Sequence, residues 1–319
     1  MFIFVHKIEK HLFMKNMVNF KNVLLATVIF TASSCSILQP NNSLSVDTFP
    51  KFSYEGHRGA RGLHPENSIG AMKIAIDLPK VTTLEMDCHI TKDKKVVVYH
   101  DHFLNPKFVQ YNDGKELSEK EKKNLIYDYT YDELQNFDIG SKFYEAFPDQ
   151  EKTPTNINLL SELIDASEKY ALEKRKEPMF YNIEIKSKPG KELEYHPRVD
   201  EFADLMLGVI VDAGIAERTV IQSFDIKAIQ HVNQFYPQIK TSYLISSLGE
   251  KSLEEHIKDL GFTPFILSPN YKIVTKDLVK QAHRLGMKVI PWTVNDKKEI
   301  SKLKSLKVDG IISDYPNLF

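Results

Sequence analysis

The chain has 319 residues, of which 42% are hydrophobic and 27% are charged, and its formal net charge is −1. These values are typical of a globular protein with one large domain or two ordinary ones. Because the sequence contains no basic block, it offers no concentrated positive surface for nucleic acid, and we expect no nucleic-acid partner.

The first 35 residues have the features of an export signal. Lys15 and Lys21 lie close to an apolar run, 23–30, which is too short to span a bilayer. Small residues then precede Cys35, a pattern that resembles a bacterial lipoprotein lipobox, in which the cysteine is lipidated. An ordinary cleaved signal peptide is the alternative. We therefore expect an exported protein of the bacterial cell envelope, in the periplasm or as an outer membrane lipoprotein with a lipid anchor.

Residues 36–52 are polar and interrupted by proline, which is typical of a tether. The expected organisation is an export signal over 1–35, a linker over 36–52 and one folded domain over 53–319.

From residue 53 onward, short apolar runs alternate with amphipathic stretches, so the sequence predicts strands that alternate with helices. We expect strands over 53–57, 83–90, 95–100, 179–186, 219–224, 241–246, 264–268, 288–294 and 309–313. We expect helices over 68–77, 118–123, 131–136, 159–175, 198–213, 225–235, 250–259, 275–285 and 296–305.

This alternation indicates an α/β fold with a largely parallel sheet. About eight strand–helix units in a domain of this length match a TIM (β/α)8 barrel, somewhat distorted. A doubly wound open sheet is the alternative. That fold usually carries a glycine-rich phosphate loop after its first strand, but here His57 and Arg58 occupy the turn.

The turn after the first strand combines a proton-transfer side chain with a cation. Gly56, Gly59 and Gly62 let the backbone approach a ligand closely, because they have no Cβ. Histidine exchanges protons near neutral pH, and the planar fork of arginine matches phosphate oxygens. His57 and Arg58 therefore indicate a phosphate ester site.

The strand over 83–90 carries two carboxylates. Glu85 and Asp87 are two residues apart, so they point to the same face. Burying both is costly unless a cation lies between them, and oxygen ligands suit Ca²⁺ or Mg²⁺. An edge strand with solvated acids is the alternative, which the apolar Leu84 and Met86 on the other face disfavour.

A short turn follows this strand, so 83–90 and 95–100 should form a local hairpin. A turn centred near Asp93 and Lys94 places Asp87 opposite His100. A strand-end histidine that faces solvent is the alternative. Residues 103–156 are rich in Asn, Asp, Lys and Tyr, and we interpret them as an insertion on the barrel face after the 95–100 strand, where insertions often cover active sites.

The strand over 179–186 has one polar and one apolar face. Asn182, Glu184 and Lys186 share the polar face, and polar side chains at the carboxyl end of a barrel strand indicate an active site. Glu184 would complete a set of three carboxylates, and Lys186 would neutralise a substrate phosphate. Gln222 and Trp292 end later strands; Trp292 lines either the core or the pocket.

These motifs occur together in the order found in one family. The matching segments are His57-Arg58-Gly59, Pro65-Glu66-Asn67-Ser68, Glu85-Met86-Asp87, His100-Asp101, Ile183-Glu184-Ile185-Lys186, Gln222-Ser223-Phe224, Pro291-Trp292-Thr293-Val294-Asn295 and Asp309-Gly310-Ile311-Ile312-Ser313-Asp314-Tyr315-Pro316. The ordered set resembles the glycerophosphodiester phosphodiesterase family over residues 54–319.

The resemblance implies a TIM barrel that holds one divalent cation, Ca²⁺ or Mg²⁺. It assigns metal binding to Glu85, Asp87 and Glu184, and general acid–base catalysis to His57 and His100.

It further assigns phosphate contacts to Arg58 and Lys186. Glu66 matches a motif glutamate with a less defined role, and ordering of its loop by hydrogen bonds is the simpler interpretation. Gln222 and Trp292 are further candidates.

The implied reaction is hydrolysis of a glycerophosphodiester to sn-glycerol 3-phosphate and an alcohol, through a cyclic phosphate. One alternative keeps the chemistry but changes the substrate to lysophospholipids, glycerophosphoinositol or polymeric glycerol phosphates. Another is a lipoprotein that binds phosphodiesters without turning them over.

Overall fold

The computed structural model describes residues 49–319 of the chain. The expected export signal, the lipidated Cys35 and most of the linker over 36–52 lie outside the described residues, so they stay predictions. Between residues 49 and 319, no helix is both long enough and apolar enough to cross a bilayer.

Strands that pair in parallel form a closed ring within the described residues. They are β1 (Ser53–Gly56), β2 (Thr83–Ile90), β7 (Phe180–Ile185), β8 (Thr219–Ser223), β9 (Lys240–Ile245), β10 (Ile266–Pro269), β11 (Lys288–Val289) and β12 (Gly310–Ser313). Their order is β11-β10-β9-β8-β7-β2-β1-β12. The ring closes where the Asp309 amide donates to the Val289 carbonyl at 2.8 Å and the Ile312 amide donates to the Pro291 carbonyl at 3.0 Å.

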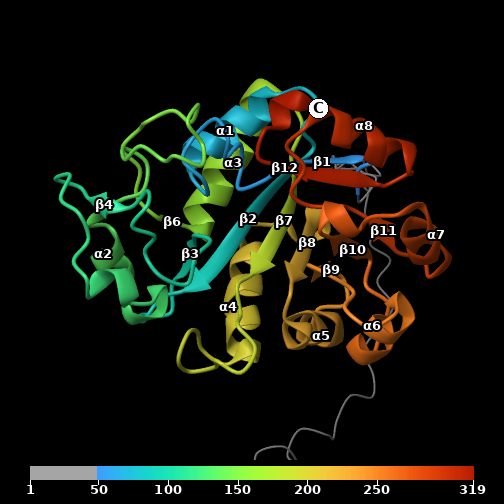
Figure 1. The fold of residues 1–319 in the computed structure, drawn as a ribbon. Coiled ribbons are helices and arrows are strands. Elements are labelled where there is room, and N and C mark those ends of the chain that lie inside the picture. Colours follow the sequence, from blue (N-terminus) through green and yellow to red (C-terminus); the bar gives the residue numbers. More distant parts are fainter. Residues whose placement is uncertain (1–48) are drawn as a thin grey trace, which may run out of the picture. The chain divides into compact units, whose positions relative to one another are not determined.

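Helices connect these strands and lie around the outside of the ring (Figure 1). They are α1 (Ile69–Asp77), α3 (Leu160–Lys174), α4 (Val199–Asp212), α5 (Ile226–Phe235), α6 (Leu253–Leu260), α7 (Lys276–Arg284) and α8 (Lys297–Ser305), with 3₁₀ turns η3 (Ala216–Arg218), η4 (Tyr271–Ile273) and η5 (Pro316–Leu318). Side-chain caps at Ser68, Asp225 and Thr275 fix where three of the helices begin. The architecture is the predicted TIM barrel, and the doubly wound alternative is wrong because the sheet closes.

The predicted hairpin after β2 exists, but its register differs from the prediction by one residue. Strand β3 (Val96–Val98) runs antiparallel to β2, with Cys88 opposite Val98. The Tyr99 amide donates to the Asp87 carbonyl at 2.9 Å, so Tyr99, rather than His100, lies opposite Asp87. The connection has an odd number of residues, with Lys94 at φ 60°, and its centre is therefore at one residue rather than between two.

The segment over 103–156 forms a separate layer beside β3 (Figure 1). It contains β4 (Gln110–Tyr111), η1 (Glu121–Lys123), η2 (Ile126–Asp128), α2 (Tyr131–Leu134) and β5 (Phe137–Asp138), and β6 (Asn158–Leu159) follows it. The helix predicted over 118–123 is only the 3₁₀ turn η1. Apolar side chains of this segment make their own cluster with Val97 and Tyr99, which anchors the insertion to the barrel.

Candidate active site

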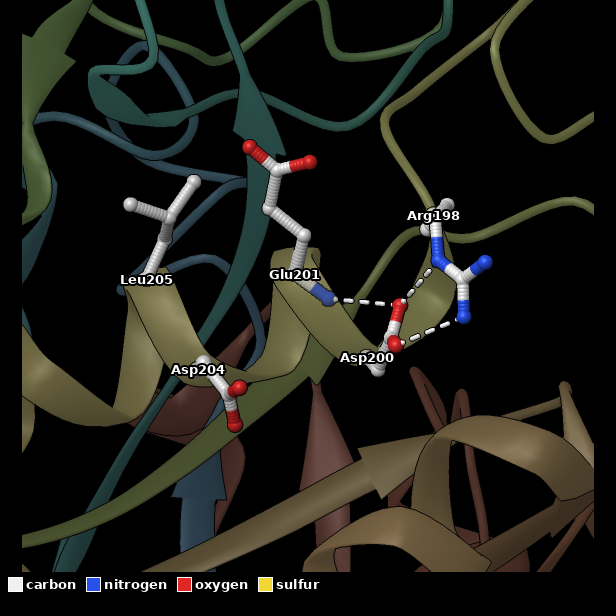
Figure 2. Close-up of a pocket in the computed structure, with 5 residues that line it drawn as sticks. All are labelled: Arg198, Asp200, Glu201, Asp204 and Leu205. Atoms are coloured by element: carbon white, nitrogen blue, oxygen red, sulfur yellow. Dashed lines mark hydrogen bonds and ion pairs between the residues drawn. The ribbon is translucent and has the colours of Figure 1, made fainter. Parts of the chain in front are cut away.

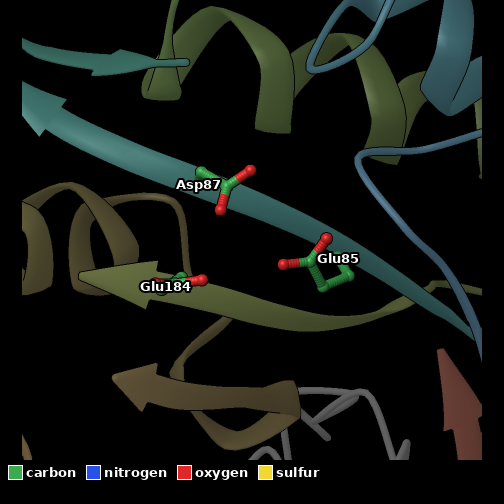
Figure 3. Close-up of side chains that lie close together, drawn as sticks. All are labelled: Glu85, Asp87 and Glu184. Atoms are coloured by element: carbon green, nitrogen blue, oxygen red, sulfur yellow. The ribbon is translucent and has the colours of Figure 1, made fainter. Parts of the chain in front are cut away.

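Three buried carboxylates lie together on neighbouring strands. Glu85 and Asp87 come from β2 and Glu184 from β7, and one carboxylate oxygen of each lies within 4.8 Å of the others (Figure 3). The parallel register sets Asp87 opposite Glu184. The buried Asp87 Oδ1 has no hydrogen-bond partner among the described residues. An all-oxygen cluster with an unpartnered carboxylate oxygen fits a Ca²⁺ or Mg²⁺ ion.

The pKa values of the three carboxyl groups are shifted in different directions. Burial raises the pKa of Glu85 well above its usual value, and the neighbouring Asp87 raises it further. Burial and Asp87 also raise the pKa of Glu184 to about 7, although Lys186 opposes the shift. Burial acts the same way on Asp87, but the charges of His100 when it is protonated, of Arg58 and of Lys186 outweigh it and hold the pKa of Asp87 well below the usual range. A cation must therefore displace protons from the glutamates to bind.

We expect the affinity for the metal to decrease as the pH is lowered. Because Glu184 has a pKa of about 7, its ionised fraction at pH 6 is about one tenth of that at pH 8. The apparent affinity for Ca²⁺ or Mg²⁺ should therefore be at least about tenfold weaker at pH 6 than at pH 8. Isothermal titration of the metal-free protein in buffers of different ionisation enthalpy would measure both the affinity and the released protons. Equal affinity at the two pH values would contradict a proton-linked site.

Neighbouring amides orient these carboxylates. The Gln222 side chain donates to Glu85 Oε1 at 2.8 Å. The backbone amide of Arg58 donates to Glu85 Oε2 at 2.8 Å, and the Asn67 side chain donates to Asp87 Oδ2 at 2.9 Å. Such partners fix ligand geometry around a metal, so Gln222 is suited to orienting a ligand. Asn67 also belongs to the site. It lies in the matching segment Pro65-Glu66-Asn67-Ser68, but the sequence alone predicted no role for it.

In each of the two histidines, Nδ1 lies within hydrogen-bond distance of an aspartate carboxylate. His57, in the turn after β1, has Nδ1 2.6 Å from Asp314 Oδ1. His100, just beyond β3, has Nδ1 2.7 Å from Asp101 Oδ1. Since an ionised carboxylate only accepts, each neutral ring carries its proton on Nδ1 and leaves Nε2 as a proton acceptor. In His57 that Nε2 lies 3.9 Å from Glu85 Oε2, beside the carboxylate cluster.

Burial favours the neutral form of both histidines. Burial lowers the pKa of His57, with Asp314 opposing the shift and the Arg58 charge adding to it. Burial and then the Arg58 charge lower the pKa of His100. Burial alone would raise the pKa of Asp314, but His57 and Arg61 hold it well below the usual range. Neutral imidazoles with a free nitrogen can act as general bases at neutral pH.

Asp314 and Asp101 contact the two histidines, and the sequence predicted no role for either, although both lie within the matching segments. Asp314 directly follows β12, and its other oxygen accepts from the Asn295 side chain at 2.7 Å. Asp101 Oδ2 accepts from the Asn105 side chain at 2.6 Å. The place of Asp314 at the carboxyl end of a barrel strand was the available signal.

We expect Asp314→Asn to lower turnover by about 10²–10⁴-fold with little change in KM. Asn295 donates to one side of Asp314, so an amide would turn its NH₂ group toward His57 and favour the wrong tautomer. Steady-state kinetics would measure the effect. The matched control is Asp204→Asn, which alters a surface aspartate that pairs with His231 at 2.7 Å. Unchanged turnover in Asp314→Asn would contradict the positioning role.

The two arginines of the site, Arg58 and Arg61, share the carboxylate of Glu66. Glu66 accepts from Arg58 Nη1 at 2.7 Å and lies 2.6 Å from Arg61 Nε. Arg58 Nε also lies 3.3 Å from Asp87 Oδ2, so Arg58 is tied to two acids. Lys186 Nζ lies 3.0 Å from Glu184 Oε1. Glu66 thus holds two guanidinium groups in place, in line with the interpretation that it orders its loop.

These groups surround one cavity of about 120 Å³. Its apolar side includes Trp292, whose ring NH donates to the Ser268 carbonyl at 2.9 Å and whose ring packs perpendicular to that of Phe224, with 5.4 Å between the ring centres. Every predicted site residue except Asp87 and Glu66 lines this cavity, and both of these carboxylates contact Arg58, which does line it. The lining is His57, Arg58, Arg61, Glu85, His100, Glu184, Lys186, Gln222, Phe224, Leu244, Trp292, Thr293 and Ile312.

A second hollow lies at the beginning of α4 (Figure 2). Arg198 and Asp200, which both line it, pair at 2.9 Å, and its other lining residues belong to α4. Because its lining comes from one stretch of chain, it lacks the convergence of elements that marks the barrel cavity, and we assign no site to it.

Comparisons with known proteins agree with this geometry. A model of the glycerophosphoryl diester phosphodiesterase family matches residues 57–318. The chain belongs to this family. It is therefore a glycerophosphodiester phosphodiesterase, a phosphoric diester hydrolase.

Two curated relatives show how far the similarity extends. A glycerophosphodiester phosphodiesterase of Bacillus subtilis is 28% identical over 307 residues, which covers 92% of this chain and 91% of the relative. One from Caldanaerobacter subterraneus is 29% identical over 260 residues, covering 82% and 93%.

Solved structures share the fold. A protein from Silicibacter pomeroyi, described as a glycerophosphoryl diester phosphodiesterase, superposes with a TM-score of 0.74 at 29% identity, covering 84% of this chain and 92% of that one. An Oleispira antarctica phosphodiesterase in complex with the product sn-glycerol-3-phosphate has a TM-score of 0.64 at 23% identity, covering 82% and 92%. The family fold thus spans most of the chain.

Proposed function

We propose that this protein hydrolyses glycerophosphodiesters to sn-glycerol 3-phosphate and an alcohol through a cyclic phosphate. The observation that carries the proposal is the pair of carboxylate-backed histidines, His57 and His100, on one cavity with a buried carboxylate cluster. The Oleispira relative in complex with sn-glycerol-3-phosphate supports the same product.

In the first step, Nε2 of one histidine removes the proton from the glycerol 2-hydroxyl, whose oxygen attacks phosphorus. The bond from phosphorus to the leaving alcohol breaks, and the other histidine, which enters this step protonated on both ring nitrogens, donates its Nε2 proton to the leaving oxygen. In the second step, water opens the cyclic phosphate while the two histidines exchange roles. Arg58 and Lys186 contact the phosphate oxygens.

Glu85, Asp87 and Glu184 would hold the divalent cation. When bound, a Ca²⁺ or Mg²⁺ ion there would withdraw charge from a phosphate oxygen and lower the pKa of the attacking hydroxyl.

The test is release of sn-glycerol 3-phosphate from glycerophosphocholine by the purified protein supplied with metal. A panel of glycerophosphoinositol, lysophospholipids and polymeric glycerol phosphates, with the released alcohol measured, would find the preferred leaving group. Calorimetric binding of these diesters with no product over hours would instead support the non-catalytic alternative.

The cellular location is part of the same proposal. Export and lipidation of Cys35 would place the enzyme at the cell envelope, close to phospholipid-derived diesters. Mass spectrometry of the mature N-terminus would test this directly.

A further inference from the structure

Arg61 is the one arginine of the cavity wall to which sequence reasoning gave no role. It follows Arg58 by three residues in the turn after β1, and it lines the same cavity as His57 and Lys186. Its Nε lies 2.6 Å from Glu66 Oε2. On the other side, Nη1 is 3.8 Å from Asp314 Oδ1, which is longer than a hydrogen bond. The terminal nitrogens therefore retain donors for a ligand.

The insertion fixes the position of this side chain. The Arg61 guanidinium lies over the ring of Phe147, 4.4 Å from its centre. The side chain of Gln150 donates to the Arg61 carbonyl at 2.7 Å, and the Glu151 amide donates to the Leu63 carbonyl at 2.9 Å. The segment over 147–151 thus contacts both the backbone of the turn and the side chain of Arg61.

This arrangement leaves the donating edge of Arg61 available. A guanidinium that lies over an aromatic ring uses its face for that contact, so its N–H groups still point outward in their plane. Glu66 supplies one negative charge between two positive ones, those of Arg58 and Arg61. Arg61 therefore shares its nearest carboxylate with Arg58, and a phosphate oxygen can accept from its terminal nitrogens.

We propose that Arg61 is a substrate-binding residue, whose guanidinium binds phosphate oxygens of the diester and of the phosphate monoester product in a position set by Phe147. The identity of the anion rests on the proposed function. Planar bidentate binding of phosphate is the chemistry for which arginine is best suited. The insertion then contributes to phosphate affinity through Arg61.

The test is calorimetric binding of sn-glycerol 3-phosphate to the full chain with saturating Ca²⁺. We expect Arg61→Gln to bind about tenfold more weakly or worse, because a charge-assisted contact is lost. Phe147→Leu keeps the charge but removes the aromatic face, and we expect about threefold weaker binding. Arg61→Lys should fall between wild type and Arg61→Gln, because it keeps a charge without the planar fork.

The matched control is Arg198→Gln, which removes an arginine paired with Asp200 at the beginning of α4 (Figure 2) and should bind as wild type does. Thermal unfolding of each variant separates loss of fold from loss of affinity, and Arg61→Lys keeps the charge beside Glu66 if the glutamine variant is unstable. Wild-type affinity in both Arg61 variants would overturn the inference while the proposed reaction stood. A wild-type protein that neither binds sn-glycerol 3-phosphate nor hydrolyses glycerophosphocholine would refute both.

Discussion

Alanine at His57 or at His100 should reduce turnover of glycerophosphocholine by about 10²–10⁴-fold in each case, because each change removes a general acid–base group. Both rings present a free Nε2 while a carboxylate holds Nδ1 at 2.6 Å and 2.7 Å. Stopped assays of sn-glycerol 3-phosphate release would give kcat and KM. We expect the loss mainly in kcat, since both histidines act on the reacting atoms.

The matched control is His231→Ala, because His231 also pairs with an aspartate, Asp204 at 2.7 Å, but on the surface. A diester with a nitrophenol leaving group separates the two roles. Such a leaving group needs little protonation, so the variant that lacks the general acid should recover most of its activity on it. Wild-type turnover in either His57→Ala or His100→Ala would show that the proposed acid–base pair is wrong.

Removal of the divalent cation should abolish measurable turnover, and addition of Ca²⁺ or Mg²⁺ should restore it. A metal's charge stabilisation is worth several kcal/mol, so we expect a loss of roughly 10³-fold or more. Asp87→Asn should reproduce this loss, because the buried Oδ1 of Asp87 has no hydrogen-bond partner within residues 49–319 and is free to bind the ion. Activity before and after chelation would be measured for wild type and variant.

Thermal unfolding provides a second test of the metal site. Added metal should raise the unfolding temperature of the wild-type protein, because a ligand that binds only the folded state stabilises it. In Asp87→Asn this rise should be much smaller. Asp200→Asn, at the exposed beginning of α4, is the matched control and should behave as wild type. Full activity after exhaustive chelation would contradict the metal site.

The barrel could be predicted because its strands and helices have clear local patterns. The strand over 83–90 was predicted with the bounds that the structure gives, and the helix over 275–285 differs from α7 by one residue at each end. Glu85 and Asp87 share a face because strands alternate, which needs no tertiary information. The insertion was harder to predict, since its short elements depend on packing against β3 rather than on local periodicity.

The exact pairing of neighbouring segments could not be predicted in the same way. The hairpin register was wrong by one residue because the number of residues in the turn, rather than the hydrophobic pattern, sets it. Nonetheless His100 reaches the cavity, because it lies beyond the last ladder pair.

The sequence by itself determined the residue types of the site: two histidines, three carboxylates and their spacing along strands that alternate with helices. Tertiary structure decided which groups act together. Asp314 meets His57 because β12 lies beside β1 in the closed ring. Arg61 meets Phe147 because the insertion folds back on the first turn. Both contacts join residues far apart in the chain, and the physical reason is that ring closure and insertion packing, rather than local propensity, bring them within reach.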